Sequence, residues 1–150
     1  MQSANATDSS TALRTALAKV DAEVQSIAHW SYQGSTAVAV WFQDSSIVVA
    51  NIGDSRAVIS RKGTATQLTL DHKPDDPVEL SYIHSKGGRV TCDDTPRVNG
   101  NLALSRAIGD RAERPFVHAT PDIERFILDD DSDFIVLASD GLWDVMSTQE

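Results

Sequence analysis

The sequence predicts an α+β domain in which short strands, mostly joined by hairpins, combine with a few helices. Of the 150 residues, 41% are hydrophobic, which is enough to form the core of one globular domain. Apolar residues recur at helical spacing near the N-terminus and again around residues 78–86. The middle of the chain carries several short β-type runs. It lacks the strand–helix alternation that a doubly wound parallel sheet requires.

The first predicted element is a helix from about Ser10 to His29, which follows a polar tail at residues 1–9. The apolar residues of this segment are spaced so that they share one face of a helix. They are Leu13, Leu17, Val20, Val24 and Ile27. We expect this face to pack on a sheet.

Strand-type segments follow the helix. Ser35–Gln43 is rich in valine and aromatic residues, which favour strands. Ile47–Ala50 and Ala57–Arg61 flank the turn residues 51–56, a pattern typical of a β-hairpin. A further strand is predicted at Gln67–Leu70.

A second helix is predicted over residues 78–86, because Pro77 suits the first turn of a helix and Gly87-Gly88 suits its end. Arg89–Arg97 is expected to hold a short strand and an acidic turn. Residues 99–110 are expected to form a loop whose apolar side chains point inward.

The last predicted strands are Ile123–Leu128 and Phe134–Ala138. The second is a fully apolar run, which predicts a buried central strand. Such a strand would deliver Asp140 at its C-terminal end. If a helix begins there, Asp144 lies one helical turn away from Asp140.

The composition excludes several classes of protein. The net charge of −9 argues against nucleic-acid binding, which needs a basic surface. No apolar run approaches the ~20 residues of a membrane span, and the first residues lack the pattern of a secretory signal. Cys92 is the only cysteine, so no disulfide is expected. An intracellular protein, cytoplasmic or nuclear, fits these features.

Three carboxylates are candidate ligands for a hard divalent cation. Asp140 and Asp144 would repel each other unless a cation or a proton lay between them, and Asp54 lies in a turn between two strands. Taken alone, ordinary turn and helix-cap roles remain open for each of the three.

Two other chemistries do not fit the sequence. The acidic run Asp129–Asp133 is not a calcium-binding loop, because the sixth and twelfth positions hold Phe134 and Asp140 rather than Gly and Glu. Cys92 is a poor candidate nucleophile, because the adjacent carboxylates of Asp93 and Asp94 disfavour a thiolate.

Seven motifs in order resemble the type 2C, metal-dependent (PPM) serine/threonine protein phosphatases. They lie at residues 34–37, 50–57, 71–74, 87–90, 97–100, 102–110 and 138–145, and the resemblance covers about residues 10–150. It implies a partial four-layer α-β-β-α sandwich, with two antiparallel sheets between layers of helices. This expectation agrees with the hairpin-rich pattern described above.

The resemblance also implies the chemistry. In this family two Mg²⁺ or Mn²⁺ ions activate a water molecule that hydrolyses phosphoserine and phosphothreonine, so no side chain acts as the nucleophile. Asp140 matches a metal-ligating aspartate, and Asp54 and Asp144 match carboxylates that hold a further metal ion with it. Arg97 lies in the segment that matches a mobile flap and is expected to touch substrate.

Some of the family's motifs are missing from this sequence. These are an N-terminal arginine that grips phosphate, an Asp-Gly-His-Gly segment and a C-terminal Asp-Asn segment. The chain is therefore expected to be a fragment that is inactive or weakly active alone. Its expected partners are phosphorylated proteins, without nucleic acid or membrane, and it is expected to be monomeric. The alternative is a pseudophosphatase or protein-binding module with the same fold.

Overall fold

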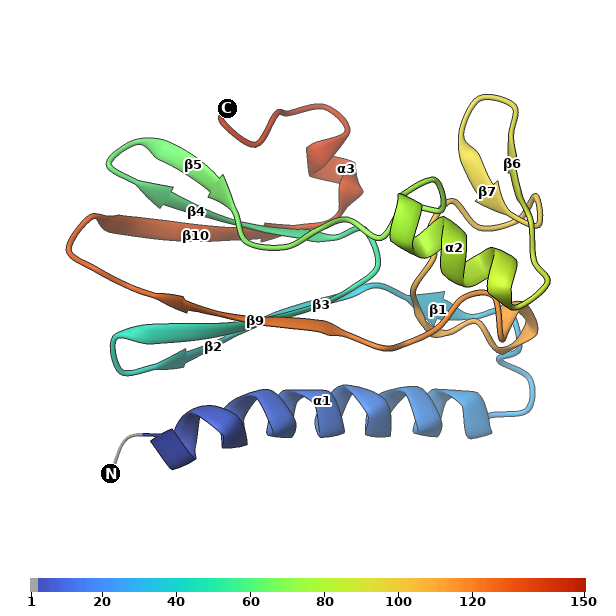
Figure 1. Cartoon of the computed structure of the whole chain (residues 1–150), viewed down its shortest axis with the longest axis horizontal. Coiled ribbons are helices and arrows are strands. Elements are labelled where there is room, and N and C mark those ends of the chain that lie inside the picture. The colour runs from blue at the N-terminus through green and yellow to red at the C-terminus, as the bar shows by residue number, and fades with distance from the viewer. Residues whose placement is uncertain (1–2) are drawn as a thin grey trace.

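Two three-stranded antiparallel sheets form the centre of the molecule (Figure 1). The computed structural model describes residues 3–150, and the side chains of residues 9–150. One sheet has the order β2-β3-β9 and the other β10-β4-β5. Their bounds are β2 (Ala37–Gln43), β3 (Ser46–Ile52), β9 (Asp122–Ile127), β4 (Arg56–Arg61), β5 (Thr64–Gln67) and β10 (Ser132–Ala138).

Helix α1 (Ser3–Ser26) covers the outer face of the β2-β3-β9 sheet (Figure 1). On the far side of the other sheet, the short helix α3 (Asp140–Trp143) follows β10. The α+β class and the layered arrangement of antiparallel sheets are therefore confirmed. Helix α1 begins at Ser3 rather than at Ser10, because the intervening residues contain neither proline nor glycine to stop it.

The second half of the chain adds helix α2 (Pro77–Ser85) and small two-stranded sheets at one end of the sandwich (Figure 1). The Asp76 side chain caps α2 by accepting a hydrogen bond of 2.9 Å from the Val78 amide. The predicted helix is thus confirmed. The predicted acidic turn is confirmed as well, because it joins the two paired strands at residues 90–92 and 96–98. The small elements are β1 (Gly34–Ser35), β8 (Ile108–Gly109), β6 (Val90–Cys92), β7 (Pro96–Val98) and the 3₁₀ helix η1 (Arg111–Glu113).

Two apolar clusters form the core. The first lies between the sheets and consists of Ile47, Val49, Ala57, Ile59 and Leu68. The second lies beneath α2 and consists of Ile83, Val98, Ala107 and Val117. Every residue of β3 is buried, because α1 covers one face of its sheet and the second sheet covers the other.

The predicted hairpin of residues 47–61 is wrong. β3 and β4 belong to different sheets, so residues 53–55 form a crossover between the two layers. The hairpins are β2–β3 and β4–β5, whose turns contain the positive-φ residues Asp44 and Lys62. The further strand is Thr64–Gln67 rather than Gln67–Leu70, since the Lys62-Gly63 turn sets its start.

The prediction that Phe134–Ala138 forms a buried central strand is also wrong. Among the described residues, β10 is an edge strand that pairs only with β4. Phe134 is 62% exposed and Leu137 43% exposed, since β10 has a neighbouring strand on one side only.

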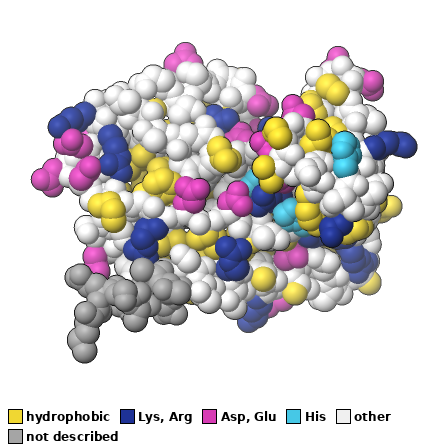
Figure 2. Space-filling model, in the orientation of Figure 1, with side chains coloured by type: hydrophobic (Ala, Val, Ile, Leu, Met, Phe, Trp, Pro, Cys, Tyr) yellow, Lys and Arg dark blue, Asp and Glu magenta, His cyan; other side chains and the backbone are white. Residues whose placement is uncertain are grey.

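The surface of the molecule is mixed in charge. On the face shown in Figure 2, basic side chains alternate with acidic ones instead of forming one patch. No helix within residues 3–150 combines the length and hydrophobicity needed to cross a bilayer.

Candidate functional site

The crossover between the sheets carries Asp54, which is only 5% exposed. It follows Gly53, whose φ of +96° suits glycine. A Cβ atom on Gly53 would lie 2.4 Å from Cγ2 of Thr36, so a larger residue does not fit. The Asn51 side chain supports the same turn by donating a 3.0 Å hydrogen bond to the Gly53 carbonyl. The backbone therefore holds Asp54 in one place.

Lys73 lies directly against Asp54, with 2.5 Å between its Nζ and Oδ2 of the carboxylate. Burial lowers the pKa of Lys73, but the hydrogen bond and charge of Asp54, with the charges of Asp71 and Asp140, outweigh burial and raise it. The ammonium group therefore stays charged. The surrounding carboxylates therefore stabilise a positive charge at this position beside Asp54.

Arg56 forms a second ion pair next to the first. It donates to both oxygens of Asp71, at 3.0 Å and 2.7 Å, and its guanidinium lies 5.3 Å from the centre of the Trp143 ring. The hydrogen bond to Asp71 raises the pKa of Arg56, and the charges of Asp71 and Asp144 add to this effect. Arg56 thus ties the crossover to helix α3.

Helix α3 supplies the other two predicted ligands. Asp140 is its first residue, separated from β10 by Ser139 alone, and Asp144 follows its last residue. The Asp144 amide donates a 2.8 Å hydrogen bond to the Asp140 carbonyl, so the two residues lie one turn apart. Both side chains are exposed. Asp140 adds its charge at Lys73 and Asp144 at Arg56, and the contact between Arg56 and the Trp143 ring places α3 near the crossover.

The chemistry of this region fits a hard divalent cation. Four carboxylates, those of Asp54, Asp71, Asp140 and Asp144, act on two cationic side chains, so negative charge is in excess. Within residues 3–150, however, no three Asp, Glu, His or Cys side chains are already arranged to hold a metal ion. The assignment of Asp54, Asp140 and Asp144 as ligands stays a prediction.

Arg97 lies elsewhere. It is exposed on the β6–β7 hairpin, which projects from the end of the molecule that carries α2 (Figure 1). Its Nη1 donates a 2.6 Å hydrogen bond to the Asn101 carbonyl. The structure does not bring Arg97 to the carboxylates, and its contact with substrate stays a prediction.

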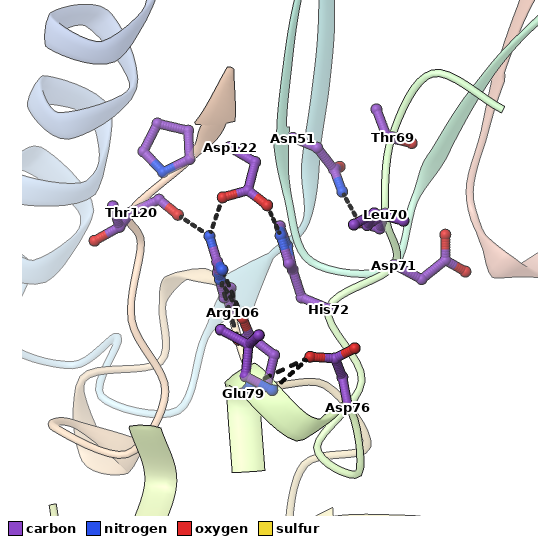
Figure 3. Close-up of polar contacts among 12 residues, drawn as sticks. Asn51, Thr69, Leu70, Asp71, His72, Asp76, Glu79, Arg106, Thr120 and Asp122 are labelled. Atoms are coloured by element: carbon purple, nitrogen blue, oxygen red, sulfur yellow. Dashed lines mark hydrogen bonds and ion pairs between the residues drawn. The ribbon is translucent and has the colours of Figure 1, made fainter. Parts of the chain in front are cut away.

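Sequence reasoning missed a polar network next to the crossover, in which His72, Glu79 and Arg106 are buried and the Asp122 side chain is 48% exposed (Figure 3). Glu79 and Asp122 both accept hydrogen bonds from Arg106, with shortest distances of 2.5 Å and 2.7 Å. Asp122 also contacts Nε2 of His72, at 3.0 Å, and the Gly53 amide donates to Nδ1 of the same ring, also at 3.0 Å. The motifs at residues 71–74 and 102–110 contain His72 and Arg106, but the sequence does not show that they meet.

Comparison with known proteins shows which family this chain resembles in sequence and in fold. The family model "Protein phosphatase 2C" matches residues 1–150. Human Protein phosphatase 1G is 47% identical over 129 residues, which cover 80% of this chain and 23% of the human protein.

Solved structures agree. Serine-threonine phosphatase 2C from Toxoplasma gondii superposes with a TM-score of 0.86 at 27% identity, over 93% of this chain and 52% of that one. A Caenorhabditis elegans sex-determining protein gives the same TM-score at 30% identity, over 90% of this chain and 34% of that one. The chain thus spans about half, or less, of the length of these three proteins. From its sequence, its sheets and its crossover, the chain belongs to the protein phosphatase 2C family.

Proposed function

We propose that this chain forms part of a Mg²⁺- or Mn²⁺-dependent phosphatase that hydrolyses phosphoserine and phosphothreonine in proteins. Family membership and the phosphatase names of its relatives support this proposal. The observation that carries it is the buried Asp54 carboxylate, which pairs with Lys73 at the point where Asp140 of α3 also adds its charge to the ammonium group. These comparisons give no support to a pure binding module over an enzyme.

Asp54, Asp140 and Asp144 would hold the divalent cation. When bound, such an ion neutralises the charge of a phosphate and makes a water molecule more acidic. The chain's own part is to position the carboxylates. Gly53 and Asn51 fix the turn that presents Asp54. Lys73 contacts Oδ2 of Asp54 and so restrains the orientation of this carboxylate.

The test is the Asp140→Asn substitution in the protein that contains this chain. We expect Mn²⁺-dependent release of phosphate from a phosphothreonine peptide to be abolished, because the amide carries no charge to hold the ion. The matched control is Asp130→Asn in the acidic turn before β10, which should leave the rate unchanged. Normal turnover by the Asp140→Asn protein would refute the assignment.

A further inference from the structure

His72 grips the backbone of Gly53 from two directions. Its amide donates to the Gly53 carbonyl at 3.1 Å, and its ring Nδ1 accepts from the Gly53 amide at 3.0 Å. The residue is only 3% exposed, so water does not compete for these bonds. The backbone N–H and C=O of Gly53, the residue that precedes Asp54, are therefore both bound by one histidine.

The hydrogen bonds fix which ring nitrogen of His72 carries the proton. A backbone amide can only donate, so Nδ1 must be unprotonated to accept from Gly53. The proton then lies on Nε2 and is donated to Oδ2 of Asp122. An imidazole protonated on both nitrogens could not hold the Gly53 amide.

Asp122 is itself held in place. Burial raises its pKa, but its hydrogen bonds from His72 and Arg106 outweigh burial and lower it, so the carboxylate stays charged. Arg106 spans Asp122 and Glu79, and Glu79 also accepts a 2.6 Å bond from the hydroxyl of Ser105. Glu79 belongs to α2 and is 3% exposed. The acceptor for the His72 ring is therefore anchored to a helix outside the sandwich.

The neighbours of this contact connect it to the candidate metal site. Gly53 directly precedes Asp54, and His72 directly precedes Lys73, the residue that pairs with Asp54. A ring that fixes Gly53 thus fixes both partners of the Asp54–Lys73 pair relative to each other. A polar cluster that served only packing would not need to end on this particular peptide.

We propose that His72 is a positioning residue for the candidate metal site. Its imidazole binds the Gly53 amide and thereby aims the Asp54 carboxylate, while Asp122, anchored by Arg106 and Glu79, sets the tautomer of the ring. The proposal rests on the proposed function in one respect, namely that Asp54 is a cation ligand.

The first experiment is NMR on the ¹⁵N-labelled wild-type chain, and it needs neither metal nor substrate. We expect a scalar coupling across the hydrogen bond between the Gly53 amide nitrogen and Nδ1 of His72. The ring should show the nitrogen shifts of the Nε2-protonated tautomer at neutral pH. A ring protonated on Nδ1 would overturn the proposal, and so would the absence of the coupling in a folded chain.

The second experiment separates the two ends of the ring. In His72→Asn the side-chain oxygen lies near the position of Nδ1 and can still accept from Gly53. In His72→Gln the amide lies near the position of Nε2, so only the contact with Asp122 is retained. Mn²⁺ binding is measured for each variant in the protein that contains this chain, by electron paramagnetic resonance, with the melting curve as a check of folding.

We expect His72→Gln to weaken Mn²⁺ binding about tenfold, as is typical when a group that orients a ligand is lost, and His72→Asn to retain most of the affinity. Equal affinity in His72→Gln and wild type would overturn the positioning role but not the proposed function. If wild type binds no Mn²⁺, the proposed function fails. The Asp54 carboxyl carbon shift then decides the positioning role, because it should change in His72→Gln and not in His72→Asn. If either variant does not fold, the wild-type coupling still decides the role.

Discussion

At the scale of single residues, the crossover depends on positions where only one residue type fits. Gly53 combines a positive φ with a close approach to Thr36, and the buried ring of His72 occupies the other side of the same peptide. Gly63 has a similar φ, +73°, but open space around it. Substitution of Gly63 therefore tests the cost of a positive φ alone, whereas substitution of Gly53 adds the cost of a steric clash.

Gly53→Ala should lower the free energy of unfolding by about 3 kcal/mol or more, because the new methyl group adds a clash with Thr36 to the strain of a positive φ. Gly63→Ala should cost only about 1 kcal/mol, the strain alone. Urea denaturation followed by circular dichroism measures both. Equal losses in the two variants would show that Thr36 moves aside freely.

At the scale of secondary-structure elements, Asp21 is one of the residues that attach α1 to the rest of the molecule. Its Oδ1 accepts from the Gly109 amide and from Nη2 of Arg114, each at 2.8 Å, and the pair is largely buried. Glu23 lies on the same helix but pairs only loosely with Lys19, at 3.9 Å, with both side chains mostly exposed. The two acidic residues thus allow a matched comparison.

Asp21→Ala should destabilise the chain by about 2 kcal/mol, because it leaves a buried amide and a buried guanidinium without this partner. Glu23→Ala should change the stability by less than about 0.5 kcal/mol, as is usual for an exposed ion pair. Denaturant titration of the two variants gives the comparison. A small loss in Asp21→Ala would mean that α1 is held mainly by its apolar face.

The elements that the sequence predicts well are those with local signals. Helix α2 has Asp76 and Pro77 at its start and Gly87 after its end, and these residues act within a few positions of themselves. The hairpin predicted at residues 47–61 is wrong, because turn residues specify a change of direction but not which sheet the next strand joins. The predicted burial of β10 is too high, since an apolar run shows a preference for burial and not the presence of a covering layer.

The same limit applies to the site. Asp54, Asp140 and Asp144 stand out within their own short motifs. The groups that hold the site lie far apart along the chain: Lys73 is 19 residues from Asp54, and Asp122 is 50 residues from His72. Their side-chain geometry depends on the packing of the sheets and α2, which no local pattern encodes.

At the scale of the whole molecule, His118 makes the stability of the fold depend on pH. Burial, reinforced by the charge of Arg106, lowers the pKa of His118 from 6.5 to about 4. The unfolded chain therefore binds a proton at this histidine between these pH values while the folded chain does not. The stability that depends on neutral His118 is complete above pH 6.5 and is lost as the pH falls towards 4.

His118→Asn should remove this part of the pH dependence, because the amide does not titrate and its oxygen can still accept from the Thr120 amide. Melting temperatures at intervals from pH 7.5 to pH 5 measure the effect, and the slope should be shallower in the variant. The depressed pKa values of Glu79 and Asp122 act at lower pH and remain in both proteins. Identical slopes from pH 7.5 to pH 5 would contradict the assignment to His118.

The passage of the chain from β3 to β4 has a mechanical consequence. Residues 53–55 are a short bridge between two facing layers, and Asp54 is part of the bridge itself. A slip of one layer along the other by a single strand residue, about 3.3 Å, would exceed the length of its contact with Lys73. The orientation of the Asp54 carboxylate therefore depends directly on how the two sheets are aligned. If one sheet slid along the other, Asp54 would be displaced even though no neighbouring residue had been substituted.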